Sequence, residues 1–184
     1  MRKIGLFIVA SLFVQFVSAQ IFFTKNGFIS FYSHTSIEDI KAENFEAVSF
    51  IDATKGELRF QVLIKGFQFP KANMQEHFNS ASYMDSDKFP KSEFKGNIIN
   101  LNAVNFKKDG IYNVDITGDL TMHGITKKIN QKGTITIKSG KPSANAVFKV
   151  KRSDFNITTP GFTAAKIADE IEVTVKCDYE PYNK

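Results

Sequence analysis

The stretch "GDLTMHGITKKI", from Gly118 to Ile129, gathers several side chains that could do chemistry. A histidine stands between a methionine and a glycine, with hydroxyl groups on both sides and two lysines near the end. Histidine titrates near neutral pH and is a frequent metal ligand, so His123 could act in acid-base or metal chemistry. The same residue types are also typical of the corner of a β-hairpin. The role of His123 therefore depends on the elements that carry it.

Other candidates for chemistry are scattered along the chain. His34 and His77 are far from His123 in sequence, and "MQEHF" has only one of the two histidines of an H-E-x-x-H zinc helix. "DSDK", at 85–88, resembles the start of a calcium loop but lacks the later glycine and glutamate, so a solvated turn is the better interpretation. No nucleophile elbow, phosphate loop or dinucleotide fingerprint occurs. We expect no catalytic residue, no metal and no cofactor; a three-histidine metal site assembled by the fold is the alternative.

The N-terminus, "MRKIGLFIVASLFVQFVSAQ", has the order of a secretory signal peptide. Arg2 and Lys3 precede an apolar run that ends in the small-residue pattern of residues 17–19, and this run is shorter than the roughly 20 residues that a spanning helix needs. We expect residues 1–19 to be cleaved before Gln20. The chain would then be periplasmic or secreted, without stable membrane insertion.

Residues 20–184 have the length of one domain, enough to bury about two thirds of the surface of the unfolded chain. The net charge of +5 falls by two when the leader is removed, which is too mild to indicate nucleic-acid binding. The chain has one cysteine, Cys177, which cannot form an internal disulfide. A hydrophobic core must therefore supply the stability.

Apolar and polar residues alternate from Gly27 to the C-terminus, with the period of half-buried strands. This pattern predicts about eight strands, joined mainly as antiparallel hairpins, with Cys177 as a core thiol. The clearest inward faces are Leu58, Phe60, Val62 and Ile64; Tyr112, Val114, Ile116, Gly118, Leu120 and Met122; Ile129, Gln131, Gly133, Ile135 and Ile137; and Ile171, Val173, Val175 and Cys177.

Turn signals that contain a glycine separate these runs. They are "TKNG" at 24–27, "DATKG" at 52–56, "KKDG" at 107–110 and "KSGKP" at 138–142, and each glycine is predicted to have a positive φ. Two segments break the alternation, Pro70–Ser80 and "TAAKIA" from Thr163. They predict one or two short helices or helical turns.

Eight antiparallel strands with one apolar face each can pack as two sheets or close into a barrel, and closure removes the exposed edges. An eight-stranded barrel has room for its own side chains or for one slender ligand. Basic residues gather at 107–108, at 127–128 and at Lys149, Lys151 and Arg152. Solubility and protection of sheet edges explain them, and attraction of an anionic head group or membrane surface is the alternative.

With the strands in place, "GDLTMHGITKKI" resembles the signature of the YceI-like family, in which a strand ends in a Gly-Asp/Asn-Leu-Thr-hydrophobic-His-Gly-hydrophobic-Thr-Lys run before a tight turn. Two further features of that family are matched in the same order by Met74–Gly96 and by "RSDFNI" at Arg152–Ile157. The resemblance implies an all-β fold, an elongated eight-stranded antiparallel lipocalin-like barrel. It also implies an apolar interior that binds a long isoprenoid or similar lipid chain, commonly in the bacterial periplasm.

We therefore predict a non-enzymatic protein that holds a polyisoprenoid or fatty-acyl lipid in the barrel lumen. Phe67, Phe69 and Met74 are candidates for a mouth or lid. His123 is expected to point outward and fix the hairpin corner through a hydrogen bond, with contact to a lipid head group at the mouth as the alternative. The candidate lumen residues are Phe60, Val62, Ile64, Phe94, Ile98, Val114, Ile116, Leu120, Ile135, Phe148 and Val173.

Two other functions compete with this prediction. One is a structural or stress-related barrel whose interior is filled by its own phenylalanines, of which the chain has 19, three of them in the leader. The other is a hydrolase or redox protein that uses His77 or His123.

Overall fold

The computed structural model describes residues 20–159, 161 and 163–182. The predicted leader, residues 1–19, lies outside the described residues. The strands are β1 (Ile21–His34), β2 (Asp39–Asp52), β3 (Glu57–Leu63), β4 (Lys91–Ile98), β5 (Gly110–Met122), β6 (Ile125–Lys138), β7 (Lys141–Lys151), β8 (Glu170–Asp178) and the two-residue β9 (Glu180–Pro181). The helix is α1 (Ala72–Asn79), and the 3-10 turns are η1 (Ile64–Gly66), η2 (Leu101–Ala103), η3 (Arg152–Phe155) and η4 (Ala164–Lys166).

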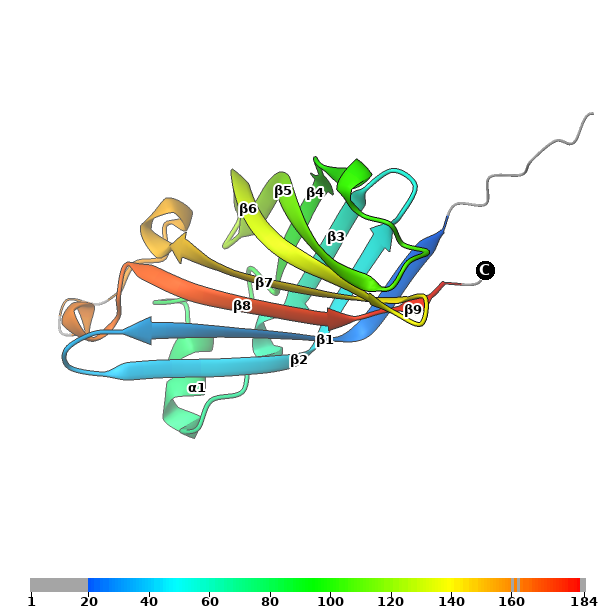
Figure 1. Ribbon diagram of the computed structural model, residues 1–184. Helices are drawn as coiled ribbons and strands as arrows, with labels where there is room; N and C mark the ends of the chain where they lie inside the picture. The colour runs from blue at the N-terminus through cyan, green and yellow to red at the C-terminus, as the bar shows by residue number, and fades with distance from the viewer. Residues whose placement is uncertain (1–19, 160, 162, 183–184) are drawn as a thin grey trace, which may run out of the picture.

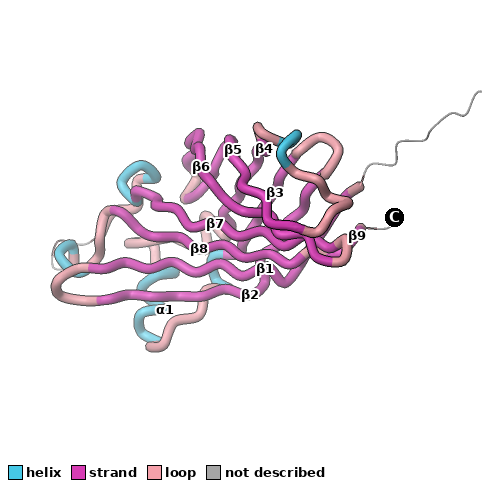
Figure 2. Tube along the Cα trace, in the orientation of Figure 1, coloured by secondary structure: helices cyan, strands magenta, loops and turns pink. Residues whose placement is uncertain are grey.

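The strands form one antiparallel sheet that closes on itself (Figures 1 and 2). Neighbours follow the order β2-β3-β4-β5-β6-β7-β8-β1, and β1 also pairs with β2, from Ile21 opposite Asp52 to His34 opposite Asp39. β9 extends the edge of β1 at Phe22 and Phe23. This topology confirms the predicted eight-stranded barrel with one short α-helix and a helical turn at η4.

Unequal strand lengths shape the barrel. β1 and β2 have 14 residues each, whereas β3 has seven and pairs with β2 only from Val48 to Ile51. The first half of β2 therefore has no β3 partner. The segment after β3 lies there instead, bonded by a bridge in which the amide of Glu43 donates to the carbonyl of Gln68 (3.1 Å) and that of Gln68 to the carbonyl of Glu43 (2.7 Å). α1 continues from this segment along the same side of the barrel (Figure 1).

Three clusters of apolar side chains hold the barrel together, as the alternating pattern predicts. The largest one contains Phe22, Ile51, Ile137, Cys177 and Tyr179, all at most 3% exposed. A second cluster joins Ile64 to Met84, Val150, Phe155 and Ile157, and a third lies beneath the segment before α1 and contains Ala42, Ala47, Val62 and Phe67. The burial of Cys177, which is 2% exposed, confirms its assignment as a core thiol.

Three of the four predicted turns are present, and the predicted positive φ is found at two of the four glycines. Gly56 and Gly140 have φ values of 73° and 74°. "TKNG" is not a turn, since it lies inside β1, where the register with β2 shifts between Thr24 and Ile29. Gly27 serves close packing instead, because a Cβ there would lie 2.9 Å from Cys177 Sγ. Gly110 begins β5 without a positive φ.

Among the described residues, no helix is long and apolar enough to cross a lipid bilayer.

Candidate functional site

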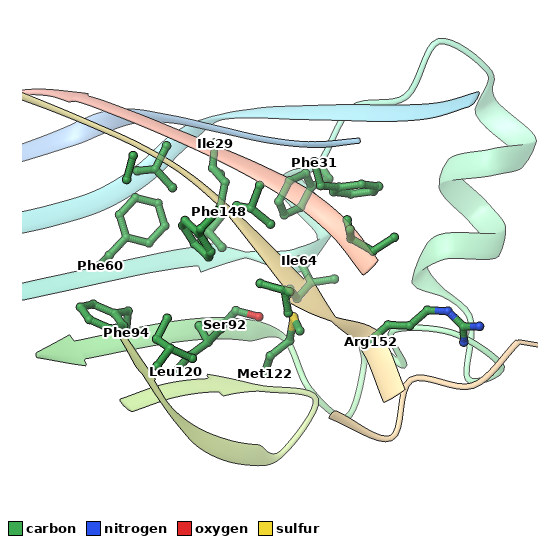
Figure 3. A pocket seen from close by; sticks show the side chains of 18 of the residues that line it. Ile29, Phe31, Phe60, Ile64, Ser92, Phe94, Leu120, Met122, Phe148 and Arg152 are labelled. Atoms are coloured by element: carbon green, nitrogen blue, oxygen red, sulfur yellow. The ribbon is translucent and has the colours of Figure 1, made fainter. Parts of the chain in front are cut away.

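A cavity of about 540 Å³ lies inside the barrel, and its wall takes side chains from each of the strands β1 to β8. The wall is almost wholly apolar, as Figure 3 shows for Ile29, Phe60, Phe94, Leu120 and Phe148. A volume of this size falls in the range of small-molecule sites. The lumen is thus hollow, which disagrees with an interior filled by the chain's own phenylalanines.

Most of the residues on the inward faces predicted from the alternation form this wall. On β5 and β6 the pairs Val114 with Gly133 and Ile116 with Gln131 lie opposite each other and face the lumen. All the candidate lumen residues line the cavity: Phe60, Val62, Ile64, Phe94, Ile98, Val114, Ile116, Leu120, Ile135, Phe148 and Val173. The three apolar mouth candidates, Phe67, Phe69 and Met74, line it as well.

The cavity is closed at one end and opens at the other. At the closed end the lining side chains of Ser49, Ile51 and Tyr179 are buried. At the opposite end, near α1 and η4, the lining includes exposed polar residues such as His77 and Lys166. An elongated ligand would therefore enter with its apolar part first and leave a polar end near α1.

Four phenylalanines, Phe31, Phe67, Phe69 and Phe78, form a cluster that we call the aromatic lid. Their ring centroids lie 5.1 to 5.8 Å apart, in the tilted and stacked geometries that aromatic pairs prefer. The lid joins α1 to β1, at the level where Phe31 pairs with Ala42 in the part of β2 that has no β3 partner. Sequence reasoning missed Phe31 and Phe78, although the four-residue spacing of Met74 and Phe78 places both on one face of α1.

Two glycines make room for Phe94 in the lumen wall. Gly96 of β4 pairs with Gly118 of β5, and a Cβ on either residue would lie 2.6 Å from Phe94 Cζ. A Cβ on Gly118 would also lie 2.5 Å from the Cα of Gly96. The ring of Phe94 can therefore lie against the wall, where it narrows the lumen less than an upright ring would.

His123 and Gly124 form a two-residue turn between β5 and β6, with φ values of 49° and 75°. Such a type I′ turn suits the twist of a hairpin, and histidine is one of the few residues enriched at positive φ. The Nδ1–H of His123 donates to the carbonyl oxygen of Phe155 (3.0 Å), and its ring meets that of Phe89 at 4.5 Å. The expected backbone hydrogen bond is present. His123 does not line the cavity, however, because this bond holds the half-buried ring against η3.

The family described as the YceI-like domain matches residues 18–179. This chain belongs to the YceI-like family. It is 32% identical over 108 residues to a UPF0312 protein of Pseudomonas putida (55% of this chain, 53% of the relative) and 31% identical over 106 residues to Protein YceI of Escherichia coli (54% and 51%). The chain thus spans about half the length of the curated relatives that it matches.

Two solved structures share the fold of this YceI-like chain. A polyisoprenoid binding domain from Saccharophagus degradans, implicated in plant cell wall breakdown, aligns with a TM-score of 0.76 at 12% identity, covering 90% of this chain and all of that one. BcnA from Burkholderia cenocepacia aligns with a TM-score of 0.68 at 17% identity, covering 84% and 96%. These likenesses show a common barrel.

The closed end of this YceI-like barrel holds a small buried hydrogen-bond network. Ser49 Oγ donates to the carbonyl of Arg59 (2.8 Å) and lies 2.8 Å from the hydroxyl of Tyr179, which donates to it. Burial raises the pKa of the neighbouring Cys177 thiol to about 11 and that of Tyr179 well above 10. Both groups are therefore protonated at neutral pH, a state in which a thiol is a poor nucleophile.

The "RSDFNI" feature of the family organises the open end. The guanidinium of Arg152, which lies at the end of the lumen side chains in Figure 3, donates from Nε to the carbonyl of Ala168 (3.1 Å) and from Nη1 to that of Ile157 (2.9 Å). Lys149 and Lys151 pair with Glu170 (3.3 Å) and Asp169 (3.7 Å). These basic side chains thus have partners within the protein, and Arg152 holds the segment that borders the mouth.

Within the part of the chain that the structure describes, no three or more histidine, cysteine, aspartate or glutamate side chains come together as possible ligands. His34 instead bonds to Asp39 (2.6 Å) at the exposed end of the β1–β2 hairpin, and His77 of α1 stacks against Tyr83, which follows that helix.

Proposed function

We propose that this YceI-like chain is an exported, non-enzymatic binding protein that holds a long apolar chain, polyisoprenoid or fatty-acyl, in its lumen. The hollow apolar cavity with one open end is the observation that carries the proposal. Burial contributes on the order of 0.8 kcal/mol per CH₂, so an apolar chain can be held without a strong polar contact. The description of the Saccharophagus degradans neighbour as a polyisoprenoid binding domain supports the same ligand class.

Two features support binding over catalysis. The buried hydroxyl and thiol groups at the closed end are protonated, and Ser49 and Tyr179 are engaged in hydrogen bonds. His123, the histidine of the family signature, is engaged with Phe155 away from the lumen. Neither group has the pairing of a nucleophile with a base that covalent catalysis requires.

Lipid extraction tests the binding proposal. The protein, purified from its native host without detergent, should release a long-chain lipid into organic solvent, and native mass spectrometry should show the matching mass on the intact protein. A parallel sample that is denatured and refolded without lipid should lack this mass and regain it when isoprenoid or fatty-acyl chains are added. A well-folded protein that carries no lipid and takes up neither class would sink the proposal.

Export is part of the proposal and has its own test. β1 begins at Ile21, so cleavage before Gln20 would leave every strand of the barrel intact. N-terminal sequencing of the protein recovered from the periplasm or the medium should give Gln20 as the first residue. A retained leader, or protein found only inside the cell, would contradict export while leaving the lipid-binding proposal open to its own test.

A further inference from the structure

Ser92 is a buried polar residue of the lumen wall whose hydrogen bonding is incomplete. It lies on β4, is 9% exposed and lines the cavity, yet its Oγ has no hydrogen-bond partner. Among the described residues only one other buried side-chain atom, Asn79 Oδ1, shares this condition, and Asn79 does not line the cavity. Figure 3 shows the Ser92 oxygen among the apolar side chains of Phe94, Leu120 and Met122.

Other deeply buried serines contrast with Ser92. Ser33 Oγ accepts the amide of Ala168 (2.9 Å), Ser49 Oγ donates to the carbonyl of Arg59 (2.8 Å), and Ser86 Oγ donates to the carbonyl of Asn79 (3.2 Å). Each of these hydroxyls has a structural partner, as buried polar groups normally do. A hydroxyl without one costs stability. The cost at Ser92 is explained if its partner arrives with the ligand.

The surroundings of Ser92 restrict what that partner can be. Ser92 pairs across the sheet with Val62, and the next inward residue of β4 is Phe94. The charged residues that line the cavity near β4 and the mouth are engaged. Glu93 pairs with Lys91 (2.8 Å), and Arg152 donates to two backbone carbonyls. Lys166 pairs with Glu38 (3.9 Å). An anionic group beside Ser92 would be buried without a counterion, which is costly. A neutral acceptor has no such cost.

We propose that Ser92 is a specificity-determining residue, whose hydroxyl donates a hydrogen bond to a carbonyl or ether oxygen on the buried part of the ligand's apolar chain. The inference rests on the proposed lipid-binding function and refines it. The favoured ligand is an apolar chain that carries a neutral acceptor inside the lumen, in preference to a plain hydrocarbon of the same size.

The test compares methyl palmitate with nonadecane, which has the same number of non-hydrogen atoms. Each compound displaces a fluorescent acyl chain from the delipidated wild type and from Ser92→Ala. For each compound, the affinity of the wild type is divided by that of the variant, so that differences in water solubility between the two compounds cancel. Ser92→Ala should lower the affinity for methyl palmitate about 3- to 10-fold, which corresponds to the loss of one neutral hydrogen bond. The affinity for nonadecane should stay unchanged.

Ser33→Ala is the matched control, because Ser33 is also a buried serine on the cavity wall but already has a partner. Ser33→Ala should lower the melting temperature of the delipidated protein and change the affinities for methyl palmitate and nonadecane by the same factor. Ser92→Ala should keep or raise that melting temperature, because it removes an unpaired polar group.

The outcomes distinguish failure of the proposed lipid-binding function from failure of the specificity role of Ser92. If wild type binds neither methyl palmitate nor nonadecane, the role of Ser92 fails. The proposed lipid-binding function fails with it only if the delipidated protein also takes up no isoprenoid chain. If wild type binds both compounds and Ser92→Ala changes the two affinities by the same factor, only the specificity role of Ser92 is overturned. A loss of thermal stability in Ser92→Ala like that in Ser33→Ala would also overturn it, since the hydroxyl would then have a partner without ligand.

Discussion

The Nδ1 of His123 lies 3.0 Å from the carbonyl oxygen of Phe155, and this hydrogen bond joins two segments 32 residues apart. His123 belongs to the turn of the "GDLTMHGITKKI" stretch, and Phe155 to the "RSDFNI" stretch. Two of the sequence features that carry the family resemblance therefore contact each other. Their contact ties the β5–β6 hairpin to η3, which follows β7 and borders the open end of the barrel.

His123→Ala should lower the free energy of unfolding by about 1–2 kcal/mol, because it removes the bond to Phe155 and places alanine at a positive φ. His123→Asn should lower the free energy of unfolding by less, since asparagine tolerates that backbone conformation and keeps an N–H donor. Urea unfolding of the three proteins measures the order. Unchanged stability with reduced lipid occupancy would instead assign His123 to the mouth.

Ile116→Trp should reduce lipid occupancy strongly while the protein stays folded, because Ile116 lines a hollow lumen that can receive part of the larger side chain. Ile137→Trp is the matched control. Ile137 is 2% exposed in the packed core and does not line the cavity, so its enlargement should cost about 1–3 kcal/mol by overpacking. Thermal unfolding and lipid extraction are both needed. Equal destabilisation with unaltered lipid content would mean that the lumen near Ile116 is not where the chain lies.

Phe78→Ala should loosen the aromatic lid and speed the release of lipid. Its ring packs against Phe31, Phe67 and Phe69, and its loss should cost about 2 kcal/mol, less than a fully buried phenylalanine because Phe78 is half-buried. Transfer of a fluorescent lipid from the protein to vesicles measures the release rate. Phe45→Ala, on an outer-face residue that is 50% exposed, should leave that rate unchanged. Equal release rates in wild type and Phe78→Ala would mean that Phe78 of α1 does not control the release of lipid.

Cys177 should make the fold sensitive to alkaline pH. Burial raises its pKa from an ordinary 9.0 to about 11, so the folded state holds the thiol proton more tightly than the unfolded state does. The stabilisation is fully present below pH 9 and is lost as the pH rises from 9 through about 11.

Denaturant midpoints across this alkaline range measure the loss for wild type and Cys177→Ala. The variant should lose less stability, although not none, because Tyr179 also has a raised pKa and remains. At neutral pH the native thiol should react slowly with a soluble alkylating reagent until urea unfolds the protein. Fast labelling of the native protein would place Cys177 outside the core.

The alternation of side chains predicted most of the inward-facing residues correctly because it is a local property. In a strand, successive side chains point to opposite faces, so the inward set of β5, from Val114 to Leu120, follows from sequence order once the strand is recognised. The turn at Gly56 could be predicted for the same reason. The turn predicted at Gly27 is absent, since β1 continues through this position by pairing with β2. The glycine there allows close packing against Cys177, a contact that sequence order does not show.

The sequence by itself therefore determined the strands, the face of each strand that turns inward and the family of the chain. The tertiary structure alone decided that the lumen is hollow, that Phe31 of β1 meets Phe78 of α1, that His123 bonds to Phe155 and that Ser92 has no partner. The physical reason is the sequence separation over which each property is set. Alternation and turn propensity act between neighbours in sequence, whereas cavity volume and the satisfaction of a buried hydroxyl depend on side chains that only the closed barrel brings together.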